Sequence, residues 1–368
     1  MVANSSEGYT PPGRLGNPSL ELSEDPRAHP KVIEALTPFG LANNAQEVPL
    51  TAESPLEHLA GYCAAAHSGF SAIYSNVPLT LPGDENEPNV EHSIETIKGV
   101  DDNDIKLHIF RKAGTEKEVL PCVVYLHGGG MNIIDNVNPV HVRWCTSLAL
   151  SGVAVMMTDF RNAWTEAERN VFPAGLKDCA AAVKYIAAHK TELGIGKIIT
   201  QGESGGANLA IATALKANRE GWIEFIDGVF GIVPYISGAY GWSTEQKIVT
   251  FPSMIETNGY LLDMGGLAAL AAYYTESKDA TNPLAWPYYA SEKDLIGLPP
   301  HILLMDELDP LRSEGQAFFR KLTAAGVSVL ASVTLGTTHG SSLMFRAALP
   351  ELHNGTVASI AAFAKRVS

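Results

Sequence analysis

Gln201-Gly202-Glu203-Ser204-Gly205-Gly206 contains a G-x-S-x-G pentapeptide, and this stretch decides the fold. The run before it, Lys197–Gln201, predicts a short buried strand, and Asn208–Leu215 predicts a helix made of good helix formers. A serine at so sharp a strand-to-helix turn has a strained backbone, which points its hydroxyl outward and requires small neighbours. We therefore predict Ser204 as a nucleophile at a helix N-terminus, where free N–H groups stabilise a developing negative charge.

Composition restricts the kind of protein and of partner. The 368 residues are enough for one large α/β domain with a sizeable core, or for two smaller domains. A net charge of −14 argues against nucleic acid or an anionic membrane as the main partner. Met1–Tyr9 lacks the basic start and apolar core of a signal peptide, and no run approaches the roughly 20 apolar residues of a membrane span. We expect a cytoplasmic protein, a monomer or homodimer, whose partner is a small molecule.

Strands and helices alternate along most of the chain, which predicts a mostly parallel sheet covered by helices on both faces. The sheet is expected to open with an antiparallel pair, Val90–Lys98 and Ile105–Phe110. Ligands of such sheets bind beyond the carboxyl ends of the strands, where Ser204 falls. We divide the chain into an N-terminal arm with cap helices (1–88) and a catalytic domain (89–368), with a cap insertion at about 235–289.

A base and an acid with suitable positions follow the serine. Serine is a weak nucleophile until a base takes its proton and a third group orients that base, and in this fold the order is nucleophile, acid, histidine. The strand His301–Met305 ends near three acids, and the next strand ends near His339. We choose Asp309 over Asp306 and Glu307 because it lies where the chain turns before a proline. A plain helix N-cap is the alternative role for such an aspartate.

The glycines of His127-Gly128-Gly129-Gly130 directly follow the apolar strand Leu120–Leu126. Glycines at this place leave N–H groups free to bind an oxyanion, so Gly129, Gly130 and Gly205 are the predicted donors. The alternatives are a flexible turn or a phosphate loop, but no Lys-Ser/Thr pair follows and no G-x-G-x-x-G is present. His127 is expected to fix the loop. We expect no metal site and no cofactor, since the histidines lack ligand-like spacing with cysteine or carboxylate.

Other residues are expected to support the site or to bind substrate. We expect a buried pair between Arg161 and Asp178 that holds the loops, and four cysteines that are small buried thiols instead of disulfides. Large aromatic side chains in the insertion are candidates for an apolar substrate pocket, with ordinary core packing as the alternative. These candidates are Trp242, Tyr260, Trp286, Tyr288 and Tyr289.

Together these motifs resemble the hormone-sensitive-lipase family of α/β-hydrolases over about residues 90–366. The motifs that match are His127–Gly130, Asp159-Phe160-Arg161, Gly202–Gly206, Asp309–Gly315 and His339-Gly340. A narrower likeness, to a macrolactone-opening carboxylesterase of the family, includes Phe160–Thr165, Ile198–Gly206, Pro234–Gly238, Ala285–Tyr288 and, in the arm, Gly13–Gly16 and Asp25–Arg27.

The resemblance implies an α/β-hydrolase fold with Ser204 as nucleophile, Asp309 as orienting acid and His339 as base. It also implies that Gly129, Gly130 and Gly205 donate to the oxyanion. Gly205 replaces the alanine that is usual in the wider family and Glu203 the usual aspartate, and neither change removes an atom that the chemistry needs.

We therefore expect a cofactor-independent serine carboxylesterase that forms an acyl-enzyme. The narrower likeness favours a macrolactone or another natural-product ester as substrate. One alternative is an acyltransferase that passes the acyl group from the same triad to an alcohol. The other is a non-catalytic small-molecule receptor on this scaffold, which the presence of His339 disfavours.

Overall fold

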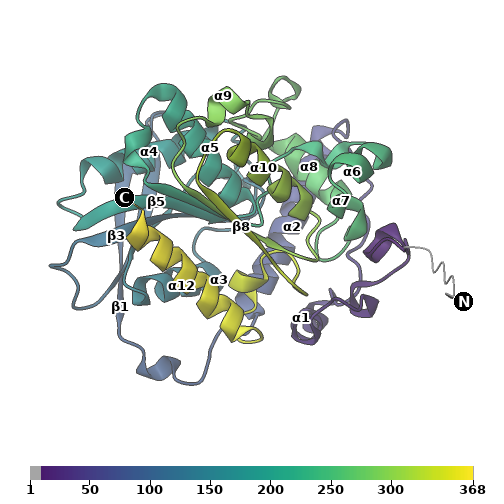
Figure 1. The fold of residues 1–368 in the computed structure, drawn as a ribbon, viewed down its shortest axis with the longest axis horizontal. Helices are drawn as coiled ribbons and strands as arrows, with labels where there is room; N and C mark the ends of the chain where they lie inside the picture. The colour runs from purple at the N-terminus through teal and green to yellow at the C-terminus, as the bar shows by residue number, and fades with distance from the viewer. Residues whose placement is uncertain (1–9, 368) are drawn as a thin grey trace, which may run out of the picture.

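A computed structural model describes residues 10–367, which form an eight-stranded sheet between two layers of helices (Figure 1). The predictions about Met1–Tyr9, the missing signal peptide and the start of the arm, lie outside the described residues. The strands lie in the order β1-β2-β4-β3-β5-β6-β7-β8. Their bounds are β1 (Val90–Lys98), β2 (Asp104–Lys112), β3 (Leu120–Leu126), β4 (Ala154–Thr158), β5 (Ile195–Glu203), β6 (Gly228–Ile232), β7 (His301–Asp306) and β8 (Val329–Thr334).

The direction of the strands confirms the predicted fold class. β1 pairs with β2 and β2 with β4 in antiparallel fashion, and every pairing from β4 across to β8 is parallel. The strands from β3 to β6 are buried along most of their length, because both faces of a parallel sheet are covered. The carboxyl ends of β3, β5, β7 and β8 therefore meet along one edge.

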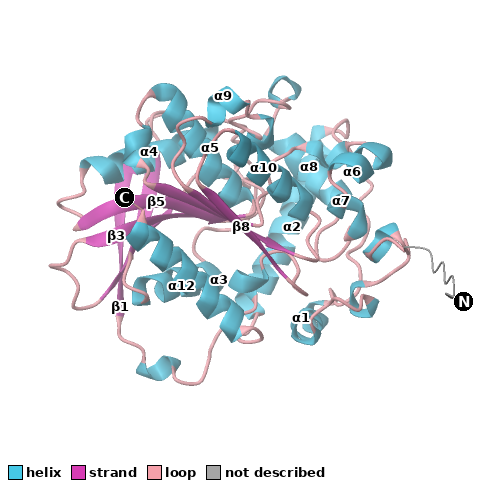
Figure 2. Cartoon of the chain, in the orientation of Figure 1, coloured by secondary structure: helices cyan, strands magenta, loops and turns pink. Residues whose placement is uncertain are grey.

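Helices cover both faces of the sheet and gather beyond that edge (Figure 2). α3 and α12 pack on one face, and α4, α5 and α10 on the other. The helix bounds are α1 (Pro30–Leu36), α2 (Leu56–Asn76), α3 (Pro139–Leu150), α4 (Ala174–Ala188), α5 (Gly205–Glu220), α6 (Thr244–Thr250), α7 (Ser253–Glu256), α8 (Met264–Tyr274), α9 (Glu292–Leu295), α10 (Arg312–Ala324), α11 (Ser341–Met344) and α12 (Pro350–Arg366).

The helices of the N-terminal region and of the insertion lie together. α2 packs against α8, and both stand with α6 and α7 at the end of the sheet where the strands finish (Figure 1). Asn208, on α5, ties both ends of the insertion to the sheet, since its amide group donates to the carbonyl oxygens of Tyr235 and Ala285, each at 2.9 Å. The boundaries at residues 88 and 235–289 stay predictions.

Most predicted elements are present, and the largest difference is in the last helix. The sequence pattern predicts a last helix over Ala358–Val367, but α12 begins at Pro350, because the proline suits the first turn and His353 is buried against α3. The pattern also predicts a helix over Tyr260–Tyr274, and α8 begins only at Met264, after Asp263 caps it. The four cysteines are free and buried, as predicted. Within residues 10–367, no helix has both the length and the apolar character that crossing a membrane requires.

The turn from β5 into α5 brings two backbones into direct contact. A β-carbon placed on Gly206 would lie 1.9 Å from the carbonyl oxygen of Leu126, at the end of β3. One on Gly202 would lie 2.3 Å from the carbonyl carbon of Gly206. Any side chain at either position requires the backbone to move. Glycine is therefore needed at these two positions because of the close backbone contact, and not because of a positive φ angle.

We predict that Gly206→Ala lowers the free energy of unfolding by about 3 kcal/mol or more, since overpacking against backbone cannot be relieved by a rotamer change. Gly355→Ala is the matched control, because Gly355 lies in α12 and a β-carbon there meets nothing within 4 Å. The control is expected to gain up to about 1 kcal/mol. Urea denaturation of both variants and the wild type measures the difference, and equal stability of the two variants would contradict the packing argument.

Candidate active site

Ser204 stands at the turn between β5 and α5 in a strained backbone conformation, with φ 55° and ψ −118°. Hydrogen bonds from both the N–H and the carbonyl oxygen of Ser204 hold the backbone in this conformation. The Ser204 N–H donates to the carbonyl oxygen of Ile232 at 2.9 Å, and the Ser204 carbonyl oxygen accepts from Asn208 at 3.1 Å. The serine thus precedes the first residue of a helix, as the sequence predicts.

His339 and Asp309 form a hydrogen-bonded pair. His339 Nδ1 lies 2.9 Å from Asp309 Oδ2, and Asp309 is fully buried. The other carboxylate oxygen of Asp309 accepts the N–H of Leu311 at 2.9 Å, so this carboxylate also ties down the turn that leads into α10. The two roles considered for Asp309, capping and orienting a histidine, are therefore compatible, because each uses a different oxygen atom.

The glycine loop after β3 approaches the turn that carries Ser204. A β-carbon on Gly205 would lie 2.7 Å from the nitrogen of Gly130, which explains why an alanine does not stand at this position. Among the hydrogen bonds within residues 10–367, none uses the N–H of Gly129 or Gly130. Both glycines have a positive φ, 102° and 62°. The three predicted donors thus lie in one small region beside Ser204.

Side chains hold this loop in place. Asn132 is fully buried, and its amide group donates to the carbonyl oxygens of Gly130 at 2.7 Å and Leu270 at 2.9 Å. His127 stacks on Phe160 with its ring 4.4 Å away, and its Nδ1 lies 2.7 Å from the Gly128 carbonyl oxygen. Burial lowers the pKa of His127 to about 4, so it is neutral near pH 7 and has the structural role that we predicted.

Glu203 links the serine turn to the glycine loop. Its Oε1 accepts the N–H of Gly128 at 2.6 Å and the hydroxyl of Tyr125 at 3.0 Å. Burial raises the pKa of Glu203 to about 8, since its neighbours include no cation that would stabilise the charge. The neighbouring His141 is neutral as well, because burial lowers its pKa to about 3.

The expected support pair lies at the other side of the loop. Arg161 binds Asp178 through its Nε at 2.8 Å and its Nη2 at 2.8 Å, and the Arg161 N–H donates to the same carboxylate at 2.9 Å. Residues just after Arg161 pair with the glycine loop, since the N–H of Ala163 donates to the carbonyl oxygen of Met131 at 2.9 Å. The Arg161–Asp178 pair therefore supports the segment that binds the glycine loop.

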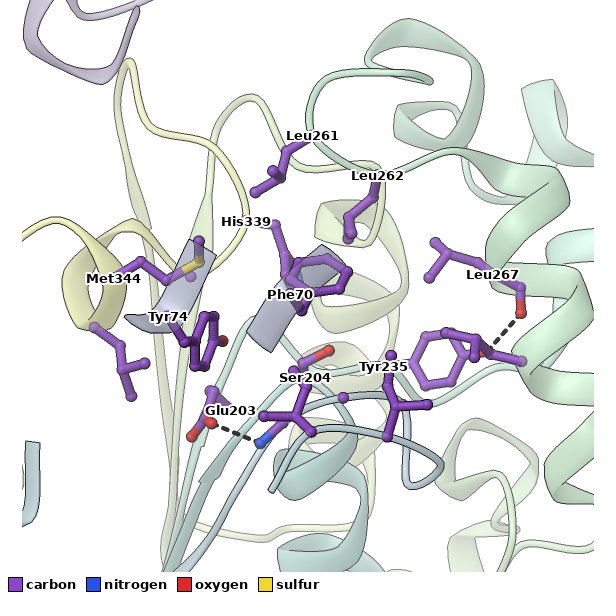
Figure 3. A pocket seen from close by; sticks show the side chains of 18 residues that line it. Phe70, Tyr74, Glu203, Ser204, Tyr235, Leu261, Leu262, Leu267, His339 and Met344 are labelled. Carbon is purple, nitrogen blue, oxygen red and sulfur yellow. Dashed lines mark hydrogen bonds between the residues drawn. The ribbon is translucent and has the colours of Figure 1, made fainter. Parts of the chain in front are cut away.

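A small pocket, with a cavity volume of about 50 Å³, lies above Ser204 and has an almost wholly apolar wall (Figure 3). Ser204, His339, Gly129 and Gly130 line its floor. The apolar wall consists of Phe70, Tyr74, Ile133, Ile134, Tyr235, Leu261, Leu262, Leu267, Leu270, Leu343 and Met344.

The aromatic residues that we proposed for substrate binding do not line this pocket. Trp286 is buried among Tyr235, Tyr240 and Tyr274. The remaining candidates also pack within the cap: Trp242 on Phe251, Tyr260 with its hydroxyl on Asp25, Tyr288 on Phe251 and Tyr289 on Tyr288. Large aromatic side chains supply much of the apolar area that a small helical layer can bury, and here they serve that purpose.

The residues that form the wall carry no sequence signal that points to the site. Phe70 and Tyr74 stand four residues apart on α2, so helical periodicity indicates that they share a face but not what the face covers. Leu261 and Leu262 belong to a loop, and Leu261 has φ 68°, which no sequence signal reveals for a leucine.

Comparison with known proteins agrees with this geometry. Residues 123–343 match a family model described as the alpha/beta hydrolase fold. Carboxylesterase NlhH of Mycobacterium tuberculosis is 30% identical over 232 residues, which are 61% of this chain and 67% of the relative. Esterase LipI of the same species is 30% identical over 224 residues, which are 60% and 65% of the two chains.

Solved structures extend the match to nearly the whole chain. Brefeldin A esterase, described as a bacterial homologue of human hormone-sensitive lipase, is 49% identical with a TM-score of 0.94, covering 97% of this chain and 98% of its own. Esterase Est22 is 35% identical with a TM-score of 0.79, covering 94% and 99%. The chain therefore belongs to the α/β-hydrolase family, within the carboxylic ester hydrolases related to hormone-sensitive lipase, as its motifs predicted.

Proposed function

We propose that Ser204, His339 and Asp309 form a catalytic triad that hydrolyses carboxylic esters through an acyl-enzyme. One observation carries this proposal: the histidine bound to a buried aspartate at 2.9 Å lines the same pocket as the strained serine. A nucleophile, a base and a group that orients the base are the three parts that such catalysis requires.

The steps follow from the positions of these groups. His339 takes the proton of the Ser204 hydroxyl while the serine oxygen attacks the ester carbonyl carbon. Asp309 holds the histidine ring and stabilises the positive charge that the ring gains. The N–H groups of Gly129, Gly130 and Gly205 bind the oxygen that becomes negative. The C–O bond then breaks, and His339 gives its proton to the departing alcohol. Water activated by His339 attacks the acyl-enzyme and releases the acid.

The pocket favours an uncharged and largely apolar ester. None of the described residues that line it is a lysine or an arginine, and Glu203, the carboxyl group beside the serine, holds its proton at neutral pH. The 49% identity to brefeldin A esterase supports a macrolactone or another natural-product ester as the substrate. The leucine and phenylalanine side chains of the wall would contact such a ring over its apolar face.

We predict that the wild type hydrolyses p-nitrophenyl esters and that Ser204→Ala lowers kcat by about 10³-fold or more, since no other group replaces the nucleophile. The release of p-nitrophenol from an acetate-to-decanoate series measures the loss, and circular dichroism verifies that the variant folds. Labelling of the wild type, and not of the variant, by an organophosphate is the matching control. Wild-type rates in the folded variant would refute the triad.

The macrolactone proposal has its own test. We expect the wild type to open the lactone of brefeldin A, seen as the mass of one added water, while Ser204→Ala leaves it intact. Leu262→Trp is expected to raise KM for the lactone more than for p-nitrophenyl acetate, because it fills the wall of the pocket and leaves the floor free. Hydrolysis of p-nitrophenyl esters without any lactone opening would be consistent with the esterase proposal and would contradict the macrolactone proposal.

Glu203 predicts how stability depends on pH. Burial raises its pKa from the ordinary 4.5 to about 8 in the folded chain, so unfolding releases a proton between these pH values and stability falls as pH rises. Glu203→Gln keeps the acceptor for Gly128 but has no proton to lose. Its free energy of unfolding relative to the wild type is expected to rise by up to about 1.4 kcal/mol for each pH unit in this window. Urea denaturation at pH 5, 6.5 and 8 measures the trend, which a constant difference would contradict.

A further inference from the structure

Asp306 is a second buried carboxyl group beside the proposed base, and the mechanism above does not use it. Its Oδ2 accepts the N–H of Gly340 at 3.0 Å and of Ser341 at 3.4 Å. Its Oδ1 lies 2.7 Å from the hydroxyl oxygen of Thr337. These three residues stand on both sides of His339, so one carboxyl group holds the loop before and after the histidine.

Asp306 is the first of four consecutive residues that all bind this loop. Glu307 accepts the N–H of Gly336 at 2.8 Å with its carboxylate, and its own N–H donates to the carbonyl oxygen of Thr334 at 2.9 Å. The N–H of Leu308 donates to the carbonyl oxygen of Thr337 at 2.9 Å. Asp309 completes the series with its bond to His339. Of the four, only Asp306 binds the two residues that follow the histidine.

Both oxygen atoms of Asp306 bind the loop, one on each side of His339. The Thr337 hydroxyl donates to Asp306 Oδ1 at 2.7 Å, while the nearby carbonyl oxygen of Thr334 already accepts the N–H of Glu307. Oδ2 accepts the two N–H groups that follow the histidine. Burial raises the pKa of Asp306 to about 7.

We propose that Asp306 is a positioning residue that fixes the ring of His339 in line with Asp309, by holding the backbone on both sides of the histidine. This inference rests on the proposed function, in which His339 is the base. A base that moves by about 1 Å can lose about 10²-fold in rate. An asparagine has the shape of the carboxyl group, with an oxygen atom that can accept the N–H groups of Gly340 and Ser341 and an amide group that can bind the Thr337 hydroxyl, whereas an alanine offers neither.

The test compares Asp306→Ala with Asp306→Asn in the full-length protein, using a p-nitrophenyl ester. We expect Asp306→Ala to lower kcat by about 10- to 100-fold with KM unchanged, since the wall of the pocket stays in place. Asp306→Asn is expected to recover most of this loss. Asp227→Ala is the matched control: Asp227 also accepts a backbone N–H, that of Ile198 at 2.8 Å, but it stands before β6, at the opposite end of the sheet. It is expected to lose stability and keep kcat.

A folded Asp306→Ala variant with the wild-type kcat would overturn the proposal, and so would an asparagine variant as slow as the alanine variant. If the alanine variant does not fold, Thr337→Val and Thr337→Ser carry the test. The valine removes the hydroxyl and is expected to lower kcat, the serine keeps it and is expected to restore kcat, and equal rates overturn the proposal. Failure of the proposed function is a separate result, in which Ser204→Ala remains active. Asp309→Asn is expected to lose more activity than any Asp306 variant.

Discussion

The site depends on a contact between two pieces of backbone, the first turn of α5 and the end of β3. Gly206 touches the carbonyl oxygen of Leu126, and Gly205 touches the peptide of Gly130 and Met131 so closely that a β-carbon would lie 2.5 Å from the Met131 nitrogen. The contact sets how far the Ser204 hydroxyl lies from the predicted oxyanion donors, and no flexible side chain takes part in it. Catalysis that stabilises charge requires donors placed before the reaction begins. Glycine is the residue that permits such an approach.

A second constraint acts at the neighbouring pair of strands. β7 and β8 are parallel and adjacent, so the loops after them run side by side. The backbone and side chains of residues 306–309 bind residues 334–341 through bonds to consecutive partners, and the Asp309–His339 bond is one of this set. The position of His339 thus depends on the hydrogen bonds between these two loops, which continue the pairing of β7 and β8, and not on Asp309 alone. Parallel strands that end together make such a set of bonds possible.

The sequence predicts the parts of the site that depend on local geometry, and it fails for those that depend on distant packing. Ser204, Asp309 and His339 are each marked by a turn at the end of a strand, and strand order then brings them to one edge. The pocket wall has no such mark. Leu261 reaches the pocket only because its backbone takes φ 68° against segments far away in the chain. The aromatic residues of the insertion are more conspicuous in the sequence than the wall residues. In the structure, however, their large apolar area packs within the cap and does not face the pocket.

The N-terminal arm connects the pocket wall with the loop that carries His339. Arg27 binds Asp25 at 2.7 Å and also pairs with Glu256, a buried residue of the insertion shortly before Leu261. Arg312, at the start of α10, binds the same Glu256 carboxylate at 2.5 Å. The N–H of His29 donates to the carbonyl oxygen of Gly336, in the loop that carries His339, at 2.9 Å.

Buried charges recover their desolvation cost only when all partners are in place, so such a network contributes more to placement than to net stability. Its members come from the arm, the insertion and the helix that follows Asp309. A displacement of the insertion that would open the pocket wall must therefore also disturb Arg312 and the turn beside the acid. Asp25, Arg27 and His29 in this way couple the shape of the pocket to the geometry of the proposed catalytic groups, although none of the three lines the pocket.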